Sequence, residues 1–183
     1  MQMIRDLGLL GISATSLQAM RASLEETLGD EAAPLLQQVG FASGDEMYDA
    51  FAQWLDEDRG TSDPVELEAS HLSDALSSFF YAVGWGTVIV ERLGAAALTI
   101  DAPSWAEASS RQDAAVPSCH VTTGLLAGFL GRLAEDVVAV MEVECRTAGH
   151  EHCRFLVGSP ETLQAVFDGM SGGTTYEEVL TTA

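Results

Sequence analysis

The segment VECRTAGHEHCRF, Val143–Phe155, holds two cysteines and two histidines, although the whole chain has only three cysteines and four histidines. Two thiolates in one turn supply half of the ligands that a tetrahedral zinc site needs. The remaining ligands would come from a small set of soft or anionic side chains, namely Cys119, Glu142, Glu144, His150 and His152. The spacing also fits a labile disulfide together with one buried thiol, because the sequence has no second cysteine pair.

The two cysteines of this segment are expected to face each other in a β-hairpin that turns at Gly149. Cβ atoms of facing residues lie about 4.5–5.5 Å apart, so the sulfurs of Cys145 and Cys153 can lie side by side. In a regular strand, Glu142 and Cys145 point to opposite faces because side chains alternate. If both bind one ion, we expect a bend or bulge between them. His150 is the substitute ligand, because from the turn it would reach the ion with less distortion.

Two other pairs of residues could do acid–base or nucleophilic chemistry. Cys119 and His120 resemble a nucleophile beside its base, but neighbours on a helix point about 100° apart and cannot form the required hydrogen bond. Glu142 and Glu144 share a strand face, where a solvated acidic surface is favoured over a pair of catalytic carboxylates. We therefore predict no catalytic residue.

A small-molecule pocket is the second candidate site. Aromatic side chains would form its walls, and a histidine would orient the ligand. The candidate pocket residues are His71, Phe79, Phe80, Trp85, Trp105 and Phe129. Core packing is the competing interpretation, because a helical pattern of apolar residues that leads into a strand is also typical of a core.

The first third of the chain is predicted to be helical. The segment TSLQAMRASLEETLG places apolar residues at steps of three and four and ends on a glycine, which is typical of an amphipathic helix. Two more helices are predicted, one ending at Gly40 and one in the acidic segment DEDRG. Asp63 followed by Pro64 indicates a helix start, and that helix is expected to continue through Phe79.

The second half of the chain alternates extended and helical patterns. β-Branched residues and glycines predict two hairpins, which turn at Gly94 and Gly149. The helix between them carries small residues from Gly124 to Gly131, and this flat side suits close packing on a sheet. Residues 160–183 are expected to be helical. The fold class is therefore α+β, with an antiparallel sheet of two hairpins packed with an amino-terminal helical bundle.

Composition limits the partners and the class of protein. The length of 183 residues suits one domain, 1–183, and the net charge of −20 comes from 28 acidic residues against eight basic ones. Nucleic acid and membranes are not expected as partners, because their anionic surfaces bind basic proteins. With no apolar run of roughly 20 residues and no signal-peptide pattern, we expect a cytoplasmic protein. Neither GxxxxGK(S/T) nor GxGxxG occurs, so no ATPase module and no built-in nicotinamide site is predicted.

The stretch Cys119–Pro160 resembles the 4-vinyl reductase domain family. That family's pattern is a cysteine, a glycine-rich helix, a strand, Glu-x-x-Cys, a Gly-His-x-x-Cys turn and an aromatic residue. The resemblance extends more loosely over residues 15–160. Carried over by motif position, the zinc ligands of the phenol-sensing relatives fall on Cys119, Glu142, Cys145 and Cys153, and such a closed four-ligand site is structural.

The resemblance also implies a fold and a role. The family is similar in fold to the ligand-binding domain shared by nitric-oxide sensors and Golgi-transport subunits. It implies a zinc-containing protein that senses or carries a small apolar or aromatic ligand, without catalysis, as a homodimer formed through the amino-terminal helices. The alternatives are an enzyme or accessory subunit in 8-vinyl (4-vinyl) tetrapyrrole reduction for bacteriochlorophyll synthesis, and a ligand-free assembly subunit.

Overall fold

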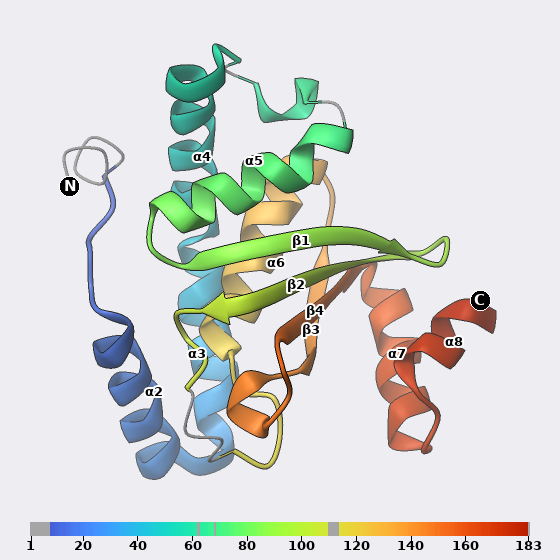
Figure 1. Ribbon diagram of the computed structural model, residues 1–183. Coiled ribbons are helices and arrows are strands. Elements are labelled where there is room, and N and C mark those ends of the chain that lie inside the picture. The colour runs from blue at the N-terminus through green and yellow to red at the C-terminus, as the bar shows by residue number, and fades with distance from the viewer. Residues whose placement is uncertain (1–7, 62, 68, 110–113, 183) are drawn as a thin grey trace.

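The computed structural model describes residues 8–61, 63–67, 69–109 and 114–182. Its centre is a four-stranded antiparallel sheet with helices on both faces (Figure 1). The strands are β1 (Gly86–Leu93), β2 (Ala97–Trp105), β3 (Ala139–Glu144) and β4 (Cys153–Gly158), in the order β1-β2-β4-β3. Both predicted hairpins are confirmed, and antiparallel pairing of β2 with β4 joins them.

The amino-terminal helices follow the predicted pattern with one difference. They are α2 (Ala14–Leu28), α3 (Ala32–Ala42), α4 (Gly44–Arg59) and α5 (Ala69–Ala82). The helix expected to run from Asp63 is instead a single turn at Pro64–Glu66, separate from α5. Asp63 caps that turn by accepting from the N–H of Val65, but Leu67 is extended, with ψ at 128°, and ends it. The cap signal was therefore correct, and the continuation into α5 was wrong.

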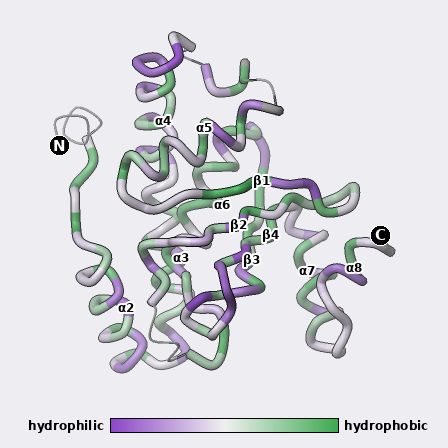
Figure 2. The backbone as a smooth tube through the Cα atoms, in the orientation of Figure 1, coloured by the Kyte–Doolittle hydropathy of each residue, from purple (hydrophilic) through white to green (hydrophobic). Residues whose placement is uncertain are grey.

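The two faces of the sheet have separate cores, because neighbouring residues on a strand point to opposite sides. On β4, Phe155 and Val157 join the main core against α4, α5 and α6 (His120–Ala134). Leu156, between them, packs instead with residues of α7 (Pro160–Ser171) and α8 (Tyr176–Thr182). Figure 2 shows hydrophobic stretches along α6 and hydrophilic ones at the outer end of α4 and around the β3–β4 turn.

The centre of the main core is aromatic. Phe51 of α4, Phe79 and Phe80 of α5, and Phe129 of α6 are fully buried. Their rings pack in tilted pairs with centroids 5.2–5.7 Å apart, the geometry that the ring quadrupoles favour. This cluster fixes α4, α5 and α6 relative to one another.

The small-residue side of α6 packs on a helix, α3, so the prediction that it packs on the sheet was wrong. A side chain at Gly124 would collide with the backbone carbonyl of Gln37, and one at Gly40 with that of Val121. The two backbones therefore touch, which only glycine allows. Small residues permit this approach to any backbone, and here the partner is helical.

Among the described residues, no helix has both the length and the apolar composition needed to span a membrane.

Candidate metal centre

Three cysteines and one glutamate converge where α6 meets the β3–β4 hairpin. Cys119 precedes the first residue of α6, Cys145 follows β3, Cys153 opens β4, and Glu142 lies on β3. One ligand atom from each lies within 4.8 Å of the others. The Cys119 sulfur is 3.8 Å from that of Cys145 and 3.9 Å from that of Cys153, and all three cysteines are wholly buried and free of disulfides. The structure thus brings together the four residues that the resemblance implied.

The expected irregularity in β3 lies between Glu142 and Glu144, where the register with β4 shifts. Glu142 pairs with Phe155, whose side chain faces the main core, and Glu144 pairs with Arg154 on the opposite face. Val143, between them, packs in the α7–α8 core. A bulge adds one residue to a strand and resets its alternation. It therefore allows Glu142 and the later Cys145 to reach the same side of the sheet.

The sizes and partners of these groups fit a tetrahedral cation. With metal–sulfur bonds of about 2.3 Å, the edge of a tetrahedron between two sulfurs is about 3.8 Å, close to the separations of Cys119 from the other two cysteines. Glu142 Oε2 accepts from the backbone N–H of Cys119 at 2.8 Å, whereas its Oε1 is buried and has no hydrogen-bond partner among the described residues. A buried carboxylate oxygen without a partner is costly. Coordination by a cation would satisfy it.

The four ionisable groups shift one another's pKa values. Hydrogen bonding to Cys145, then to Cys153, raises the pKa of Cys119, and burial adds to the shift. Hydrogen bonds from Cys119 and Cys153 hold the pKa of Cys145 well below its usual range, because two thiols stabilise one thiolate. Burial, followed by the charge of Cys145, raises the pKa of Glu142. The group therefore resists carrying several negative charges by itself, and a divalent cation would compensate them.

The structure places the histidines of the turn outside this group. His150 is exposed, and its Nδ1 lies 3.2 Å from the backbone nitrogen and 3.1 Å from the carbonyl oxygen of Cys145. His152 faces the other way, with Nε2 3.4 Å from Glu144 and 3.7 Å from Asp101. Among the described residues, Glu142 and not His150 therefore lies together with the three cysteines.

A buried glutamate that the sequence analysis missed positions the start of α6. Glu107 accepts from the N–H groups of Val121 (3.0 Å) and Thr122 (2.7 Å) and from the Thr122 hydroxyl (2.6 Å). Cys119, at the N-cap, makes no side-chain capping bond, so Glu107 satisfies those N–H groups in its place. Burial raises the pKa of Glu107 despite these bonds. No sequence pattern identifies such a capping residue, because Glu107 lies far before the first residue of α6 in the sequence.

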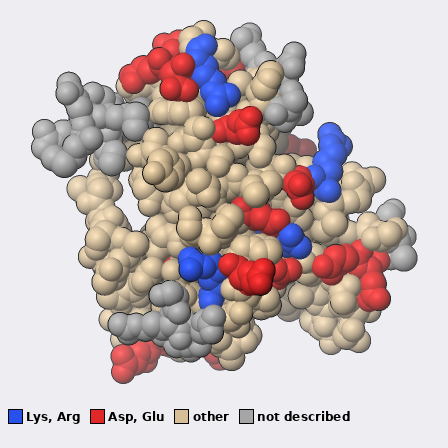
Figure 3. Space-filling view, in the orientation of Figure 1, with Lys and Arg blue, Asp and Glu red and all other residues tan. Residues whose placement is uncertain are grey.

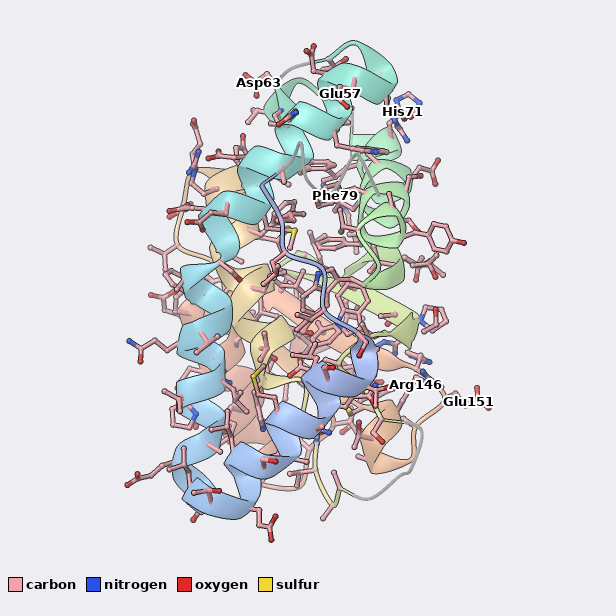
Figure 4. The ribbon with its side chains drawn as sticks, turned by 90° about the vertical axis from the view of Figure 1, so that its left-hand side faces the viewer. Glu57, Asp63, His71, Phe79, Arg146 and Glu151 are labelled. Atoms are coloured by element: carbon pink, nitrogen blue, oxygen red, sulfur yellow. The ribbon has the colours of Figure 1, made fainter. Side chains whose placement is uncertain are left out.

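The six candidate pocket residues are divided among three environments. Phe79, Phe80 and Phe129 belong to the packed aromatic core, whereas His71 is exposed near the outer end of α5 (Figure 4). Trp85 and Trp105 have ring centroids 5.6 Å apart and border surface cavities. The two tryptophans of the set therefore lie at cavities with room for a ligand.

An apolar cavity of about 360 Å³ lies beneath α2, and Trp85 forms part of its wall. Figure 3 shows an opening between the chain that precedes α2 and the body of the molecule. The other residues that line the cavity are mostly aliphatic and come from α2, α3, α6 and neighbouring segments, including Leu9, Ile12, Leu17, Met20, Leu24, Leu36, Val39, Val121 and Leu125. Its two serines, Ser13 and Ser43, already use their hydroxyls in hydrogen bonds at helix ends.

Comparisons with solved structures identify the fold. The phenol-bound sensory domain of the transcription activator PoxR superposes with a TM-score of 0.62 at 20% identity, covering 90% of this chain and 81% of that one. A trafficking protein particle complex subunit 3 from Naegleria fowleri, covalently bound to palmitic acid, has a TM-score of 0.60 at 12% identity, covering 79% and 91%. A vinyl-4-reductase family protein from Methanocaldococcus jannaschii has a TM-score of 0.41 at 20% identity, covering 61% and 66%.

Comparisons of sequence point to one family. No curated protein matches the chain. The family model of the 4-vinyl reductase domain matches residues 104–159, a range that includes all four residues of the cysteine–glutamate group. This match confirms the resemblance to the 4-vinyl reductase domain family, whose signature the chain carries in residues 104–159.

Proposed function

We propose that this chain binds a small apolar molecule as a sensor or carrier, without catalysing a reaction, and that a structural zinc ion organises the binding domain. The observation that carries the proposal is the apolar cavity beneath α2. Val121 and Leu125 of α6 line it, and α6 begins next to Cys119 of the metal centre. Two proteins of similar fold hold a phenol and a palmitic acid, which supports a role in binding small ligands.

Zinc is the cation that we propose for the metal centre. Cys119, Cys145, Cys153 and Glu142 would hold it, and three thiolates with one carboxylate suit zinc better than hard cations such as magnesium or calcium. The ion would supply positive charge and a fixed link between α6 and the β3–β4 hairpin. With four protein ligands and no open position, it would not activate a substrate.

The chemistry of the cavity defines the ligand class. No acidic or basic side chain lines the cavity among the described residues, and the serine hydroxyls are occupied. Its volume falls within the range of small-molecule sites. A neutral, largely apolar molecule would therefore fit it best, with burial of apolar surface as the driving force.

Ligand binding would act on the surface that a second copy of the chain would meet. The cavity lies between α2 and α3, and both helices expose large apolar residues, among them Met20, Leu35, Val39 and Phe41. Exposed apolar patches of this kind mark association surfaces. We propose that this surface forms a homodimer, and that a ligand beneath α2 shifts the dimerisation equilibrium by fixing α2 against α3.

A cavity-filling variant tests the proposal. Val39 lies at the cavity, with 54% of its surface exposed, so Val39→Trp should fill the space without disturbing the core. Naphthalene, measured by displacement of a fluorescent apolar dye, should bind the wild type and lose at least about tenfold in affinity in the variant. Val137→Trp, at a site with 72% exposure away from the cavity, is the matched control and should bind normally.

The same preparation separates the alternatives. Native mass spectrometry should show one zinc ion per chain and naphthalene bound to the wild type. A ligand-free assembly subunit would bind neither naphthalene nor the dye, and equal binding by both tryptophan variants would reject the cavity beneath α2. Turnover of a vinyl tetrapyrrole with added reductant would instead support the reductase alternative.

A further inference from the structure

A second cavity, of about 470 Å³, combines two indole rings with one guanidinium group. It lies where the start of α2, the α5–β1 turn, the end of β2 and the turn after β3 meet. The residues that line it are Ala14, Gln18, Tyr81, Gly84, Trp85, Gly86, Ser104, Trp105, Ala106, Ala108 and Arg146. Figure 4 shows Arg146 on the turn after β3, beside the start of α2.

Arg146 is unusual in this chain because it has no carboxylate partner among the described residues. The sequence has 28 acidic residues for eight basic ones, so a carboxylate is available to most arginines. Arg21, Arg59, Arg132 and Arg154 each form an ion pair. Within the described part of the chain, only Arg92 shares the unpaired state of Arg146. Arg146 is half-buried, and no carboxylate among the described residues pairs with its guanidinium.

Two other polar groups that line the cavity already donate hydrogen bonds within the protein. Trp105 donates its indole N–H to Thr122 at 2.7 Å, which leaves only its ring carbons for the cavity. Gln18 donates from Nε2 to the carbonyl groups of Ala106 and Ala108, at 2.9 and 3.0 Å. No aspartate or glutamate is among the described residues that line the cavity. The cavity thus offers an aromatic wall and a single positive charge.

We propose that this cavity binds an aromatic carboxylate, with the ring against Trp85 and Trp105 and the carboxylate on the guanidinium of Arg146. Trp85 is half-buried and would offer most of the aromatic surface, while Trp105, 3% exposed, supports it from behind at a centroid distance of 5.6 Å. Guanidinium and carboxylate form paired, charge-assisted hydrogen bonds, and the single positive charge of Arg146 matches the single negative charge of a carboxylate. The site shares Trp85 with the wall of the apolar cavity beneath α2, but Trp105 and Arg146 line only this second cavity, so the proposal goes beyond the proposed function.

The test compares an acid with its neutral amide on the zinc-loaded full chain. Isothermal titration calorimetry should show that 2-naphthoate binds at least about tenfold more tightly than 2-naphthamide, because only the acid pairs with the guanidinium. Arg146→Gln should reduce the affinity for 2-naphthoate to that of the amide. Arg92→Gln is the matched control, since it removes the same charge from the other unpaired arginine and should leave the affinity unchanged.

The zinc content and thermal stability of Arg146→Gln, and the binding of 2-naphthoate to Val39→Trp, serve as further controls. The backbone N–H of Arg146 donates to Cys153, and a glutamine keeps that N–H, so Arg146→Gln should retain zinc and thermal stability. Equal affinities for acid and amide in the wild type would overturn the proposal without recourse to any variant. An equal loss in Arg92→Gln would overturn it too, because the effect would then be one of overall charge. Val39→Trp should still bind 2-naphthoate, so failure of either cavity is recognisable separately.

Discussion

The two edge strands of the sheet, β1 and β3, are held by different kinds of contact. Each carries a register shift, between Thr87 and Ile89 in β1 and between Glu142 and Glu144 in β3. The outward N–H groups of β1 are taken by two serines of α5, one turn apart, at 2.9 and 3.2 Å. β3 instead bends toward the cysteines, and its Glu142 bonds to the start of α6.

The serine contacts occupy backbone N–H groups of the β1 edge, which otherwise invite association with other chains, whereas the contact of β3 uses the side chain of Glu142. The contacts of β1 come from α5, the helix that directly precedes it. They therefore form when the chain folds and require no metal ion. The contacts of β3 join groups from α6, β3 and β4, and we propose that they are complete only with a metal ion. The stability of β1 should therefore be independent of metal, and that of the β3 region should depend on it.

The largest expected effect comes from Cys153→Ala. The variant should lose the proposed zinc and unfold with a free energy lower by at least about 4 kcal/mol, because a structural metal site contributes directly to folding. Metal analysis together with thermal unfolding measures both losses. A chelator should destabilise the wild type to a similar extent and leave the variant unchanged. A variant that keeps its metal and its stability would contradict the metal-dependent half of the comparison.

A smaller and more selective effect is expected from Glu142→Gln. The amide can still accept from the N–H of Cys119, but it is a weaker metal ligand than a carboxylate, so zinc affinity should fall by about 10- to 100-fold. Competition with a chromophoric chelator measures the change. The control is Glu144→Gln, two residues away but on the opposite face, where the carboxylate contacts Tyr176. Equal losses of zinc affinity in both variants would mean that the negative charge of a nearby carboxylate sets the affinity, and not the face to which the bulge directs it.

Local signals in the sequence predicted the two hairpins of the sheet. The two hairpins were recognisable because glycines mark their turns, and both Gly94 and Gly149 have positive φ angles, 67° and 95°. The bulge in β3 followed from parity, since Glu142 and Cys145 cannot otherwise share a face. Such predictions succeed because each rests on geometry within a few residues.

The same reasoning could not predict which elements pack against each other in the tertiary structure. The glycine side of α6 predicted close packing, but small residues do not distinguish a strand from the helix α3. Phe79 and Phe129 fill the core while Trp85 borders two cavities, yet all three belong to similar apolar patterns. Glu107 caps α6 from a loop that is distant in sequence, so no pattern near the start of the helix indicates this contact.

The hydrogen bonds from the serines of α5 to β1 should stabilise that edge of the sheet independently of metal. Replacing Ser73 or Ser77 by alanine leaves the N–H of Val90 or Val88 without its partner, which should cost about 1–2 kcal/mol of unfolding free energy for each serine. Urea denaturation measures this loss, and zinc content should not change. Ser78→Ala, at an exposed position of the same helix, should have little effect. Loss of zinc in either variant would show that the two edges are coupled and would remove the distinction between them.

The smallest expected effect concerns the outer face of β3. The Tyr176 hydroxyl of α8 donates to Glu144 at 2.6 Å and accepts from Arg154 at 2.9 Å, and Arg154 also pairs with Asp101 through two bonds of 2.7 and 2.8 Å. Tyr176→Phe removes one partly buried hydroxyl, so we expect a loss of about 0.5–1.5 kcal/mol in urea denaturation, with zinc affinity unchanged. Because the bulge turns Glu144 away from Glu142, a hydroxyl on that side should not influence the ion. A measurable fall in zinc affinity would mean that the strand transmits strain across the bulge, so that the two faces of β3 act as one unit.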